Sequence, residues 1–488
     1  MRVPRCGALR SVWLPAAFTA LAGVAFPRSD RPNIVVLQTD DQDCGSLEAR
    51  RPDNGDYALA HVRALLCDRG VTFSRSFVSL PLCCPSRAAL LTGQYTHNHH
   101  VYGNSAPWGG HNRLDHANTL PVWLAAAGYE TVHVGKYLNG YNGQSIPPGW
   151  AQWFTIVGGS YYGYSMNENG TLVQYGYAEA DYSTDVLTEK AVRFIRERGP
   201  DAPPFFLMVD YIAPHVGPVG EGVAIPAPRH AGIFDAYAPA WPPSFDEPDV
   251  SDKSIWIQAL PRFDAATIAS VTESVRSRLG SLLAVDEGVA RIVRALNLAG
   301  ELERTCIVFT SDNGFLLGEH RVPGGKDLPY DESIRVPLIV RGPGVRAGVV
   351  EHEIVGNIDL APTIVSWAGA TAGRVMDGAP LQPLLAGRRT SGGREFLIAN
   401  YAYSILHPEL VRSWVGVRND DFAFIRYEGS SGGSVQDVEI YSLGPEGCPP
   451  TVDPFQLENR RTGCPPARIR DLACRLTALS ACAGESCR

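Results

Sequence analysis

Short, unbroken apolar runs recur along this chain, separated by segments with helical periodicity. Residues 33–37 (NIVVL), 306–310 (CIVFT) and 337–340 (PLIV) are three such runs. A strand that is apolar at every position suits a sheet covered on both faces, because both of its sides are then buried. Strands that alternate with helices form largely parallel sheets. The pattern therefore predicts an α/β domain with a large, mostly parallel sheet between helices.

The segments between these runs include clear helix candidates. Residues 119–128 end at Gly128, a usual helix stop, and residues 185–196 are amphipathic. From Val275 to Leu296 apolar residues recur at helical spacing over several turns. Further strands are expected at residues 129–134 and 204–209.

The character of the sequence changes after Gly387. Four short strand-like segments follow, at residues 396–400, 414–417, 422–427 and 438–441. They predict a small C-terminal α+β domain with an antiparallel sheet and at least one packed helix. The expected division is thus residues 30–387 and residues 388–488, the second domain ending in a Cys-rich tail.

The N-terminus carries three arginines before an apolar stretch that runs to Pro27 and contains a small-x-small site at residues 20–22. We interpret residues 1–27 as a secretory signal peptide, because the stretch is short for a membrane span; a signal anchor is the alternative. No other stretch is long and apolar enough to cross a bilayer, so no integral membrane segment is expected after signal removal. The net charge of −8 gives no support to nucleic-acid binding.

Eleven cysteines are consistent with an oxidising compartment. Disulfides rather than zinc are expected in the tail, because no histidine and no short CxxC pair accompanies its cysteines. Their connectivity cannot be read from the sequence. These cysteines are Cys448, Cys464, Cys474, Cys482 and Cys487. Asn169-Gly170-Thr171 is a glycosylation sequon at Asn169.

Oxygen-bearing side chains follow two of the apolar runs. Asp40 and Asp41 come shortly after residues 33–37, and Asp312 and Asn313 after residues 306–310. In open α/β sheets, ligands bind beyond the carboxyl ends of the strands. Four oxygen ligands without Cys or His suit a hard divalent cation, calcium better than zinc. Each pair taken alone is also typical of a turn or a helix cap.

Residues 83–93 (CCPSRAALLTG) carry the most specific pattern in the chain. Pro85 suits the first turn of a helix, so we expect residues 86–92 to be helical and Cys83 to lie beside the helix N-terminus, a position that favours an anion. Arg87 would lie one turn further in, able to bind the oxygens of that anion bidentately. A bare Cys-Cys pair would instead indicate buried thiols or half of a disulfide.

A cysteine two residues before Pro-Ser-Arg, closed by Leu-Thr-Gly, resembles the signature of type I sulfatases. The resemblance implies that the formylglycine-generating enzyme oxidises Cys83 during secretion to Cα-formylglycine (3-oxoalanine). The hydrated aldehyde of that residue offers two hydroxyls, one to attack sulfur and one to expel sulfate afterwards. The implied fold is an alkaline-phosphatase-like catalytic domain, here residues 30–387.

The resemblance also implies a metal and a sulfate pocket. Calcium, with magnesium as the alternative, would be held by Asp40, Asp41, Cys83, Asp312 and Asn313. Besides Cys83 and Arg87, the implied catalytic residues are Lys136 in Gly-Lys-Tyr, His215 in Ala-Pro-His and Lys326 in Gly-Gly-Lys. Taken alone, a lysine is usually solvated and a histidine usually structural.

The chain departs from the common sulfatase pattern at Leu138, where many members have a histidine. The proton for the leaving alcohol is then expected from His215 or Lys326. Gly-Lys-Tyr-Leu-Asn, the doubled cysteine and His97-Asn98-His99-His100 resemble a subgroup with N-acetylglucosamine-6-sulfatases, extracellular heparan endosulfatases, and algal and fungal arylsulfatases. The long basic insertion of the endosulfatases is missing.

Weaker candidates for substrate contacts complete the set. For the histidines of residues 97–100, helix-end packing is the alternative. The weaker candidates are His97, His99, His100, Asn139 and His320.

The sequence therefore predicts sulfate-ester hydrolysis in the secretory pathway, at an extracellular or lysosomal site. The substrate is either a sulfated glycan of the N-acetylglucosamine 6-sulfate type or an aryl sulfate. Specificity is expected in loops, such as residues 140–170 and the Pro-rich residues 217–252. A phosphomonoester or phosphonate hydrolase on the same scaffold is one alternative, and a non-catalytic secreted glycan-binding protein is another.

Overall fold

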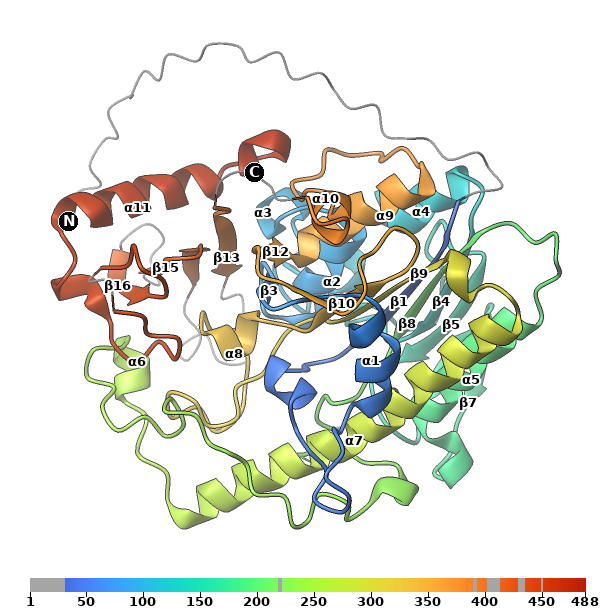
Figure 1. Cartoon of the computed structure of the whole chain (residues 1–488), viewed down its shortest axis with the longest axis horizontal. Coiled ribbons are helices and arrows are strands. Elements are labelled where there is room, and N and C mark those ends of the chain that lie inside the picture. Colours follow the sequence, from blue (N-terminus) through green and yellow to red (C-terminus); the bar gives the residue numbers. More distant parts are fainter. Residues whose placement is uncertain (1–30, 218–221, 389–392, 402–412, 429–434, 449–450) are drawn as a thin grey trace, which may run out of the picture.

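The computed structural model describes residues 31–217, 222–388, 393–401, 413–428, 435–448 and 451–488, so the predicted signal peptide lies outside the described residues. A mixed sheet runs through the middle of the molecule (Figure 1). In chain order its strands are β1 (Asn33–Thr39), β2 (Val71–Phe73), β4 (Glu130–Gly135), β5 (Gln152–Val157), β6 (Ser165–Glu168), β7 (Thr171–Gln174), β8 (Phe205–Asp210), β9 (Thr305–Ser311), β10 (Leu338–Arg341) and β11 (Val349–Glu351).

The strands are ordered β11-β2-β10-β9-β1-β8-β4-β5-β6-β7 across this sheet. The central strands β9, β1, β8, β4 and β5 are parallel to their neighbours within this group. β10 is antiparallel to β9, and β6 is antiparallel to both β5 and β7. The predicted α/β class with a large, mostly parallel mixed sheet is confirmed. A separate pair, β3 (Ser76–Phe77) and β12 (Val355–Gly356), is also parallel.

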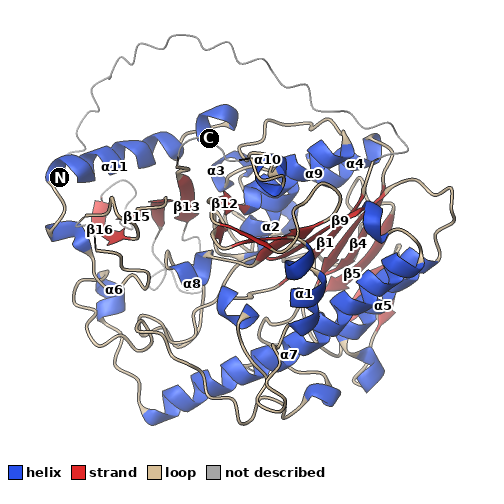
Figure 2. Cartoon of the chain, in the orientation of Figure 1, coloured by secondary structure: helices blue, strands red, loops and turns tan. Residues whose placement is uncertain are grey.

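Helices cover both faces of the sheet (Figure 2). Side chains of β1 alternate between two buried clusters: Val35 and Leu37 pack with α1, α5 and α7, whereas Ile34 and Val36 pack with α2, α4 and α9. Because each side of the strand faces a helical layer, its sequence is apolar throughout. The helices are α1 (Ala60–Leu65), α2 (Cys83–Thr92), α3 (Thr96–His99), α4 (Leu120–Ala126), α5 (Ser183–Arg196), α6 (Ile255–Gln258), α7 (Ala265–Leu298), α8 (Asp331–Ile334), α9 (Leu360–Ala368), α10 (Gln382–Leu385) and α11 (Pro466–Leu479).

Helix α7 begins well before the apolar periodicity that predicted it. Its N-cap Asp264 accepts a hydrogen bond from the Thr267 N–H, which stabilises the first turn. The residues between Ala265 and Ser270 are exposed or only partly buried, so they carry no apolar stripe that the sequence pattern could reveal.

Residues 140–170 were expected to be a loop, and this expectation is wrong. They contain β5 and β6, and β6 forms an antiparallel hairpin with β7 at the edge of the sheet. The turn is Asn169-Gly170, where φ is 52° and 95°, the left-handed conformation that an Asn-Gly hairpin adopts. The exposed Asn169 therefore forms part of the hairpin turn and is also the first residue of the sequon. In the Pro-rich segment 217–252, the described residues form only the short 3-10 helix Pro228–His230, as expected for a loop.

The C-terminal region forms the predicted antiparallel sheet, with order β13-β14-β15-β16 and α11 packed against it. Its buried cluster also includes Phe77 and Tyr95, so this sheet shares a core with the region around α2 and α3. Two disulfides, Cys448–Cys464 and Cys482–Cys487, show pairings that the sequence left open. The strands are β13 (Phe396–Asn400), β14 (Trp414–Arg418), β15 (Phe422–Glu428) and β16 (Val435–Ser442).

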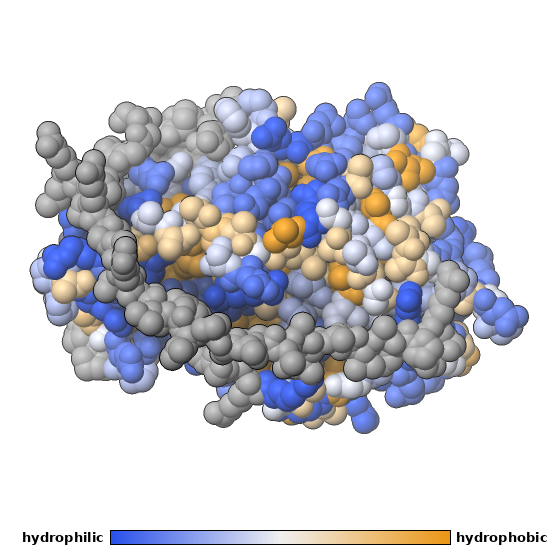
Figure 3. Space-filling view, turned by 90° about the horizontal axis from the view of Figure 1, so that it is seen from above, coloured by the Kyte–Doolittle hydropathy of each residue, from blue (hydrophilic) through white to orange (hydrophobic). Residues whose placement is uncertain are grey.

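Hydrophilic and hydrophobic residues are interspersed over the face seen in Figure 3. Among the helices that the structure describes, none combines the length and the apolar character needed to span a membrane.

Candidate active site

The parallel strands β1 and β9 end side by side, with Thr39 opposite Ser311. Their following residues therefore meet: the Asp41 N–H donates to Asp312 Oδ1 at 3.1 Å, and Asn313 Nδ2 donates to Asp41 Oδ1 at 2.6 Å. Asp40, Asp41, Asp312 and Asn313 are all buried. The structure thus brings together the four oxygen-bearing side chains predicted at these strand ends.

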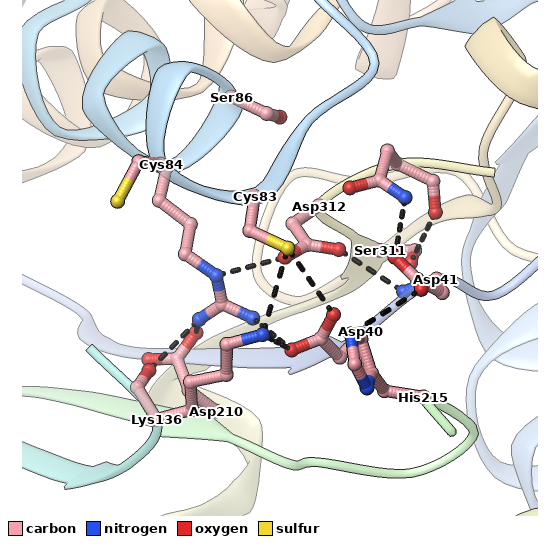
Figure 4. Close-up of polar contacts among 12 residues, drawn as sticks. Asp40, Asp41, Cys83, Cys84, Ser86, Lys136, Asp210, His215, Ser311 and Asp312 are labelled. Atoms are coloured by element: carbon pink, nitrogen blue, oxygen red, sulfur yellow. Dashed lines mark hydrogen bonds and ion pairs between the residues drawn. The ribbon is translucent and has the colours of Figure 1, made fainter. Parts of the chain in front are cut away.

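Cys83 lies beside this group at the start of α2 (Figure 4). Its Sγ is 3.7 Å from Asp40 Oδ1, 3.5 Å from Lys136 Nζ and 3.0 Å from Lys326 Nζ. Burial and the adjacent Asp40 raise the pKa of the Cys83 thiol to about 12. The helix begins at Cys83 rather than at Ser86, since the first turn leaves its N–H groups without helical partners and so accepts Pro85.

Two lysines neutralise the two aspartates. Lys136 follows β4 and bonds Asp40 Oδ2, while Lys326 bonds Asp41 Oδ1. Burial alone would raise the pKa of Asp41, but Lys326 and His215 outweigh it and lower that pKa to about 2. Burial alone would lower the pKa of Lys136, but Asp40 and Cys83 outweigh it and raise that pKa. Both members of each pair are therefore charged at neutral pH.

Arg87 is bonded to several groups of the protein itself. Its buried guanidinium donates to Asp312 Oδ2 at 2.8 Å, to Asp210 Oδ1 at 2.9 Å and to the Lys136 carbonyl at 2.8 Å, with Asp40 Oδ2 at 3.4 Å. Through these contacts Arg87 orients the carboxylates and the residues after β4. Bidentate binding of the reacting oxygens by Arg87 stays a prediction.

His215 completes the group from the end of β8. Its Nε2 is 3.7 Å from Asp41 Oδ2, its Nδ1 is 2.7 Å from the Val216 carbonyl, and 31% of its side chain is exposed. Potential ligand atoms of Asp40, Asp41, Cys83 and His215 lie within 4.8 Å of one another. His215 is thus a group with access to solvent at an otherwise buried cluster.

The donor set fits a hard metal ion. The buried Asn313 Oδ1 has no hydrogen-bond partner among the described residues, although it lies beside Asp41. Amide and carboxylate oxygens are the ligands that calcium and magnesium prefer. An orphaned amide oxygen at a cluster of three aspartates therefore fits the oxygen ligands of the predicted set, Asp40, Asp41, Asp312 and Asn313, and Cys83, its fifth member, lies beside them.

Asp210 and His133 were missed from the sequence. Asp210 is the last residue of β8, accepts from Arg87, and its Oδ2 lies 3.1 Å from His133 Nε2. His133 Nδ1 is in turn 2.6 Å from Thr155 Oγ1. Asp210 directly follows the apolar run 205–209, so the strand-end rule that identified Asp40 could have found it.

The weaker histidine candidates contact other parts of the protein. His97 Nε2 is 2.9 Å from the Cys482 carbonyl oxygen, and the buried His99 accepts from the Val101 N–H. His320 is buried, with Nδ1 2.7 Å from Glu247 Oε2 and its ring stacked on Tyr330. No hydrogen bond or ion pair in the described residues joins His97, His99 or His320 to Cys83, and substrate contacts by these histidines stay a prediction. His100 is exposed.

A cavity of about 300 Å³ adjoins the cluster. It is lined by residues 136–141 after β4, by Ile156, Gly158 and Gly159 at the end of β5, and by Ile212 and His215 after β8. A larger cavity of about 630 Å³, lined in part by Asn297 and Arg341, contains none of these reactive side chains. The smaller one is therefore the candidate substrate site.

The chain matches the model of a known protein family over most of its length. The family model described as Sulfatase matches residues 32–370. The chain belongs to the sulfatase family. A second model, described as the C-terminal part of N-sulphoglucosamine sulphohydrolase, matches residues 318–445.

Similar curated proteins are themselves named sulfatases. A putative extracellular sulfatase Sulf-1 homolog of Caenorhabditis elegans is 36% identical over 362 residues, which cover 72% of this chain and 49% of that protein. Human N-acetylglucosamine-6-sulfatase is 32% identical over 499 residues, with 94% and 86% covered. The arylsulfatase of Volvox carteri is 34% identical over 522 residues, with 97% and 77% covered. This sulfatase chain thus spans about half the length of the nematode relative.

Solved structures share the fold. The structure of BT4656 in complex with its substrate D-glucosamine-2-N,6-O-disulfate has a TM-score of 0.73 and 25% identity, and covers 92% of this chain and 97% of that one. The phosphonate monoester hydrolase of Agrobacterium radiobacter, at 21% identity, has a TM-score of 0.69 and covers 92% and 96%. The fold is therefore that of sulfatases, and the second comparison shows a likeness of fold alone.

Proposed function

We propose that this sulfatase hydrolyses sulfate esters to an alcohol and inorganic sulfate through a formylglycine formed from Cys83. The arrangement around Cys83 carries the proposal: its Sγ lies within 3.5 Å of two lysine Nζ atoms, beside the buried Asp40 and Asp41. A sulfuryl group held there would be surrounded by cations. When formed, the hydrated aldehyde supplies one hydroxyl to attack sulfur and a second to release sulfate.

The surrounding residues have distinct roles in this proposal. Lys136 and Lys326 neutralise the charge that develops on the sulfuryl oxygens. His215 is the proton donor to the leaving alcohol, because it reaches both the cluster and the adjoining cavity. Arg87 keeps Asp40 and Asp312 in place through its hydrogen bonds.

The proposed metal is calcium, with magnesium as the alternative, held by Asp40, Asp41, Asp312 and Asn313 together with the modified residue 83. Bound there, the ion would polarise the sulfate oxygens and favour the deprotonated hydrate. The unpartnered Asn313 Oδ1 supports this assignment, and the carboxylate and amide oxygens of these four side chains favour calcium over zinc.

The proposed substrate is a sulfated glycan of the N-acetylglucosamine 6-sulfate type, with an aryl sulfate as the alternative. Relatives named N-acetylglucosamine-6-sulfatase and arylsulfatase support both. The proposed route is secretory, to an extracellular or lysosomal site, with residues 1–27 as signal peptide and the formylglycine-generating enzyme as partner. The proposed domains are residues 30–387 and 388–488.

Peptide mass spectrometry across residues 81–87, combined with kinetics on an aryl sulfate and the matching aryl phosphate, tests the proposal. We expect formylglycine at position 83 and preference for the sulfate. Cys83→Ala should lose activity by roughly 10³-fold or more, as removal of a nucleophile does. Cys306→Ala is the control, because Cys306 is equally buried but lies within β9. Full activity with an unmodified thiol, or preference for phosphate, contradicts the proposal.

A further inference from the structure

The two adjacent cysteines of α2 contact different parts of the protein. A helix turns by about 100° per residue, so consecutive side chains point in different directions. Figure 4 shows the Cys84 sulfur directed away from the group around Cys83. Cys84 is fully buried, and the Asn139 N–H donates to its Sγ at 3.0 Å. Cys84 therefore contacts the loop after β4 rather than the predicted metal ligands.

Asn139 is held on three sides. Its N–H bonds Cys84, its carbonyl accepts from the His111 N–H at 2.7 Å, and its Oδ1 lies 3.5 Å from Cys84 Sγ. The Cys84 thiol donates to this Oδ1. With Oδ1 directed at the thiol, the amide nitrogen is directed elsewhere.

The amide nitrogen of Asn139 is available to a ligand. Within the described part of the chain, Nδ2 has no hydrogen-bond partner, and Asn139 lines the cavity of about 300 Å³ beside the cluster. The only cations among the residues lining that cavity are Lys136 and, when protonated, His215, and both contact the aspartates. Away from the sulfate end, the lining offers apolar and aromatic surfaces and this amide donor.

We propose that Cys84 is a positioning residue that orients Asn139, so that the Asn139 amide N–H groups bind an uncharged acceptor oxygen on the sugar ring of the leaving alcohol. Such an acceptor is a ring hydroxyl or an acetamide carbonyl. This inference rests on the proposed function, and it assigns substrate selection to a pair of residues outside the group around Cys83.

A double-mutant cycle tests the pair, with Cys84→Ala, Asn139→Ala and the double variant assayed on N-acetylglucosamine 6-sulfate and on 4-nitrophenyl sulfate. The second substrate has neither a ring hydroxyl nor an acetamide. For the sugar sulfate we expect kcat/KM to fall about tenfold in each single variant, chiefly through KM, as expected for a lost hydrogen bond. The double variant should be no worse than Asn139→Ala, because both changes remove the same contact.

Further measurements separate positioning from a general structural effect. Formylglycine occupancy, measured by mass spectrometry, normalises every rate. Turnover of 4-nitrophenyl sulfate should stay within about twofold of the wild type, since it makes no such contact. Cys84→Ser keeps a hydrogen-bond donor, so its KM for the sugar sulfate should lie between those of the wild type and Cys84→Ala. Cys306→Ala should leave the ratio of the kcat/KM values for the two substrates unchanged.

Additive losses in the double variant, or equal losses on both substrates at equal occupancy, would overturn the proposal. A wild type that hydrolyses neither sulfate would reject the proposed function instead. In that case, binding of N-acetylglucosamine 6-sulfate measured by calorimetry tests the role of Cys84. Cys84→Ala and Asn139→Ala should each still weaken this binding about tenfold.

Discussion

Lys326 Nζ lies 3.0 Å from Cys83 Sγ although 243 residues separate the two in the sequence. Lys326 follows β9, whereas Cys83 begins α2. The ion pair between Lys326 and Asp41 holds the ammonium beside the sulfur. Burial lowers the pKa of Lys326, but Asp41 and the other acidic groups nearby together outweigh it and raise that pKa. A permanent cation is thus placed next to the proposed nucleophile by an aspartate from the strand end of β1.

Lys326→Met should lower kcat/KM for an aryl sulfate by about 10²–10³-fold without reducing formylglycine at position 83, because it removes a charge that stabilises the transition state. Lys190→Met is a matched control: both side chains are 13% exposed and ion-paired, but Lys190 pairs with Glu168. Its activity should equal that of the wild type. A decrease below tenfold for Lys326→Met would contradict the role assigned to this lysine.

Calcium should raise the Tm of the protein, and a chelator should reverse the rise, because an ion that binds only the folded state stabilises it by about 2.7 kcal/mol at 100 times its Kd. Asn313→Ala should shift this calcium titration to higher concentrations, since it removes the unpartnered Oδ1. Asn167→Ala is the control, because that buried asparagine already bonds Tyr141, Gly143 and Gly170. It should lower Tm but leave the midpoint of the titration unchanged. Equal titrations for wild type and Asn313→Ala would exclude this ligand.

Asp210→Asn should lower the free energy of unfolding by about 3 kcal/mol, because it removes a carboxylate from the buried Arg87. Urea denaturation measures the effect. Asp185→Asn serves as comparison, since the pair of Asp185 with Arg229 is partly exposed and should contribute less than about 1 kcal/mol. Similar losses for the two variants would show that Asp210 does not support Arg87.

Glu439 should make the protein less stable as the pH rises from about 4.5 to 7. Burial, only partly offset by Lys253, raises the pKa of Glu439 from 4.5 to about 7. The folded state therefore binds a proton more tightly than the unfolded state, and the resulting stabilisation is full below pH 4.5 and lost through pH 7. The change is at most about 3 kcal/mol.

Glu439→Gln isolates this contribution. The difference in unfolding free energy between wild type and Glu439→Gln should change across that window. Urea denaturation at several pH values provides the comparison. A difference that is constant from pH 4.5 to 7 would disprove the assignment of the effect to Glu439.

Local sequence rules found most of the groups around Cys83, because each follows from one element. Asp40, Asp41, Asp312 and Asn313 each follow an apolar run, and parallel strands that pair in register place such residues at one edge. Asp210 follows the same rule and was overlooked. By contrast, nothing local separates a histidine that packs against the tail, such as His97, from one that reaches the site, such as His215.

The sequence by itself determined the α/β architecture, the position of Cys83 at a helix N-terminus and the oxygen-bearing strand ends, because periodicity and motif are properties of short segments. Only the tertiary structure decided which charged groups pair. Arg87 contacts three carboxylates, and Lys136 and Lys326 each form an ion pair with one aspartate. The contact between Cys84 and Asn139 is likewise tertiary. These contacts join residues far apart in the chain. They depend on which side chains the packed helices and strands bring within hydrogen-bonding distance, and no short segment carries that information.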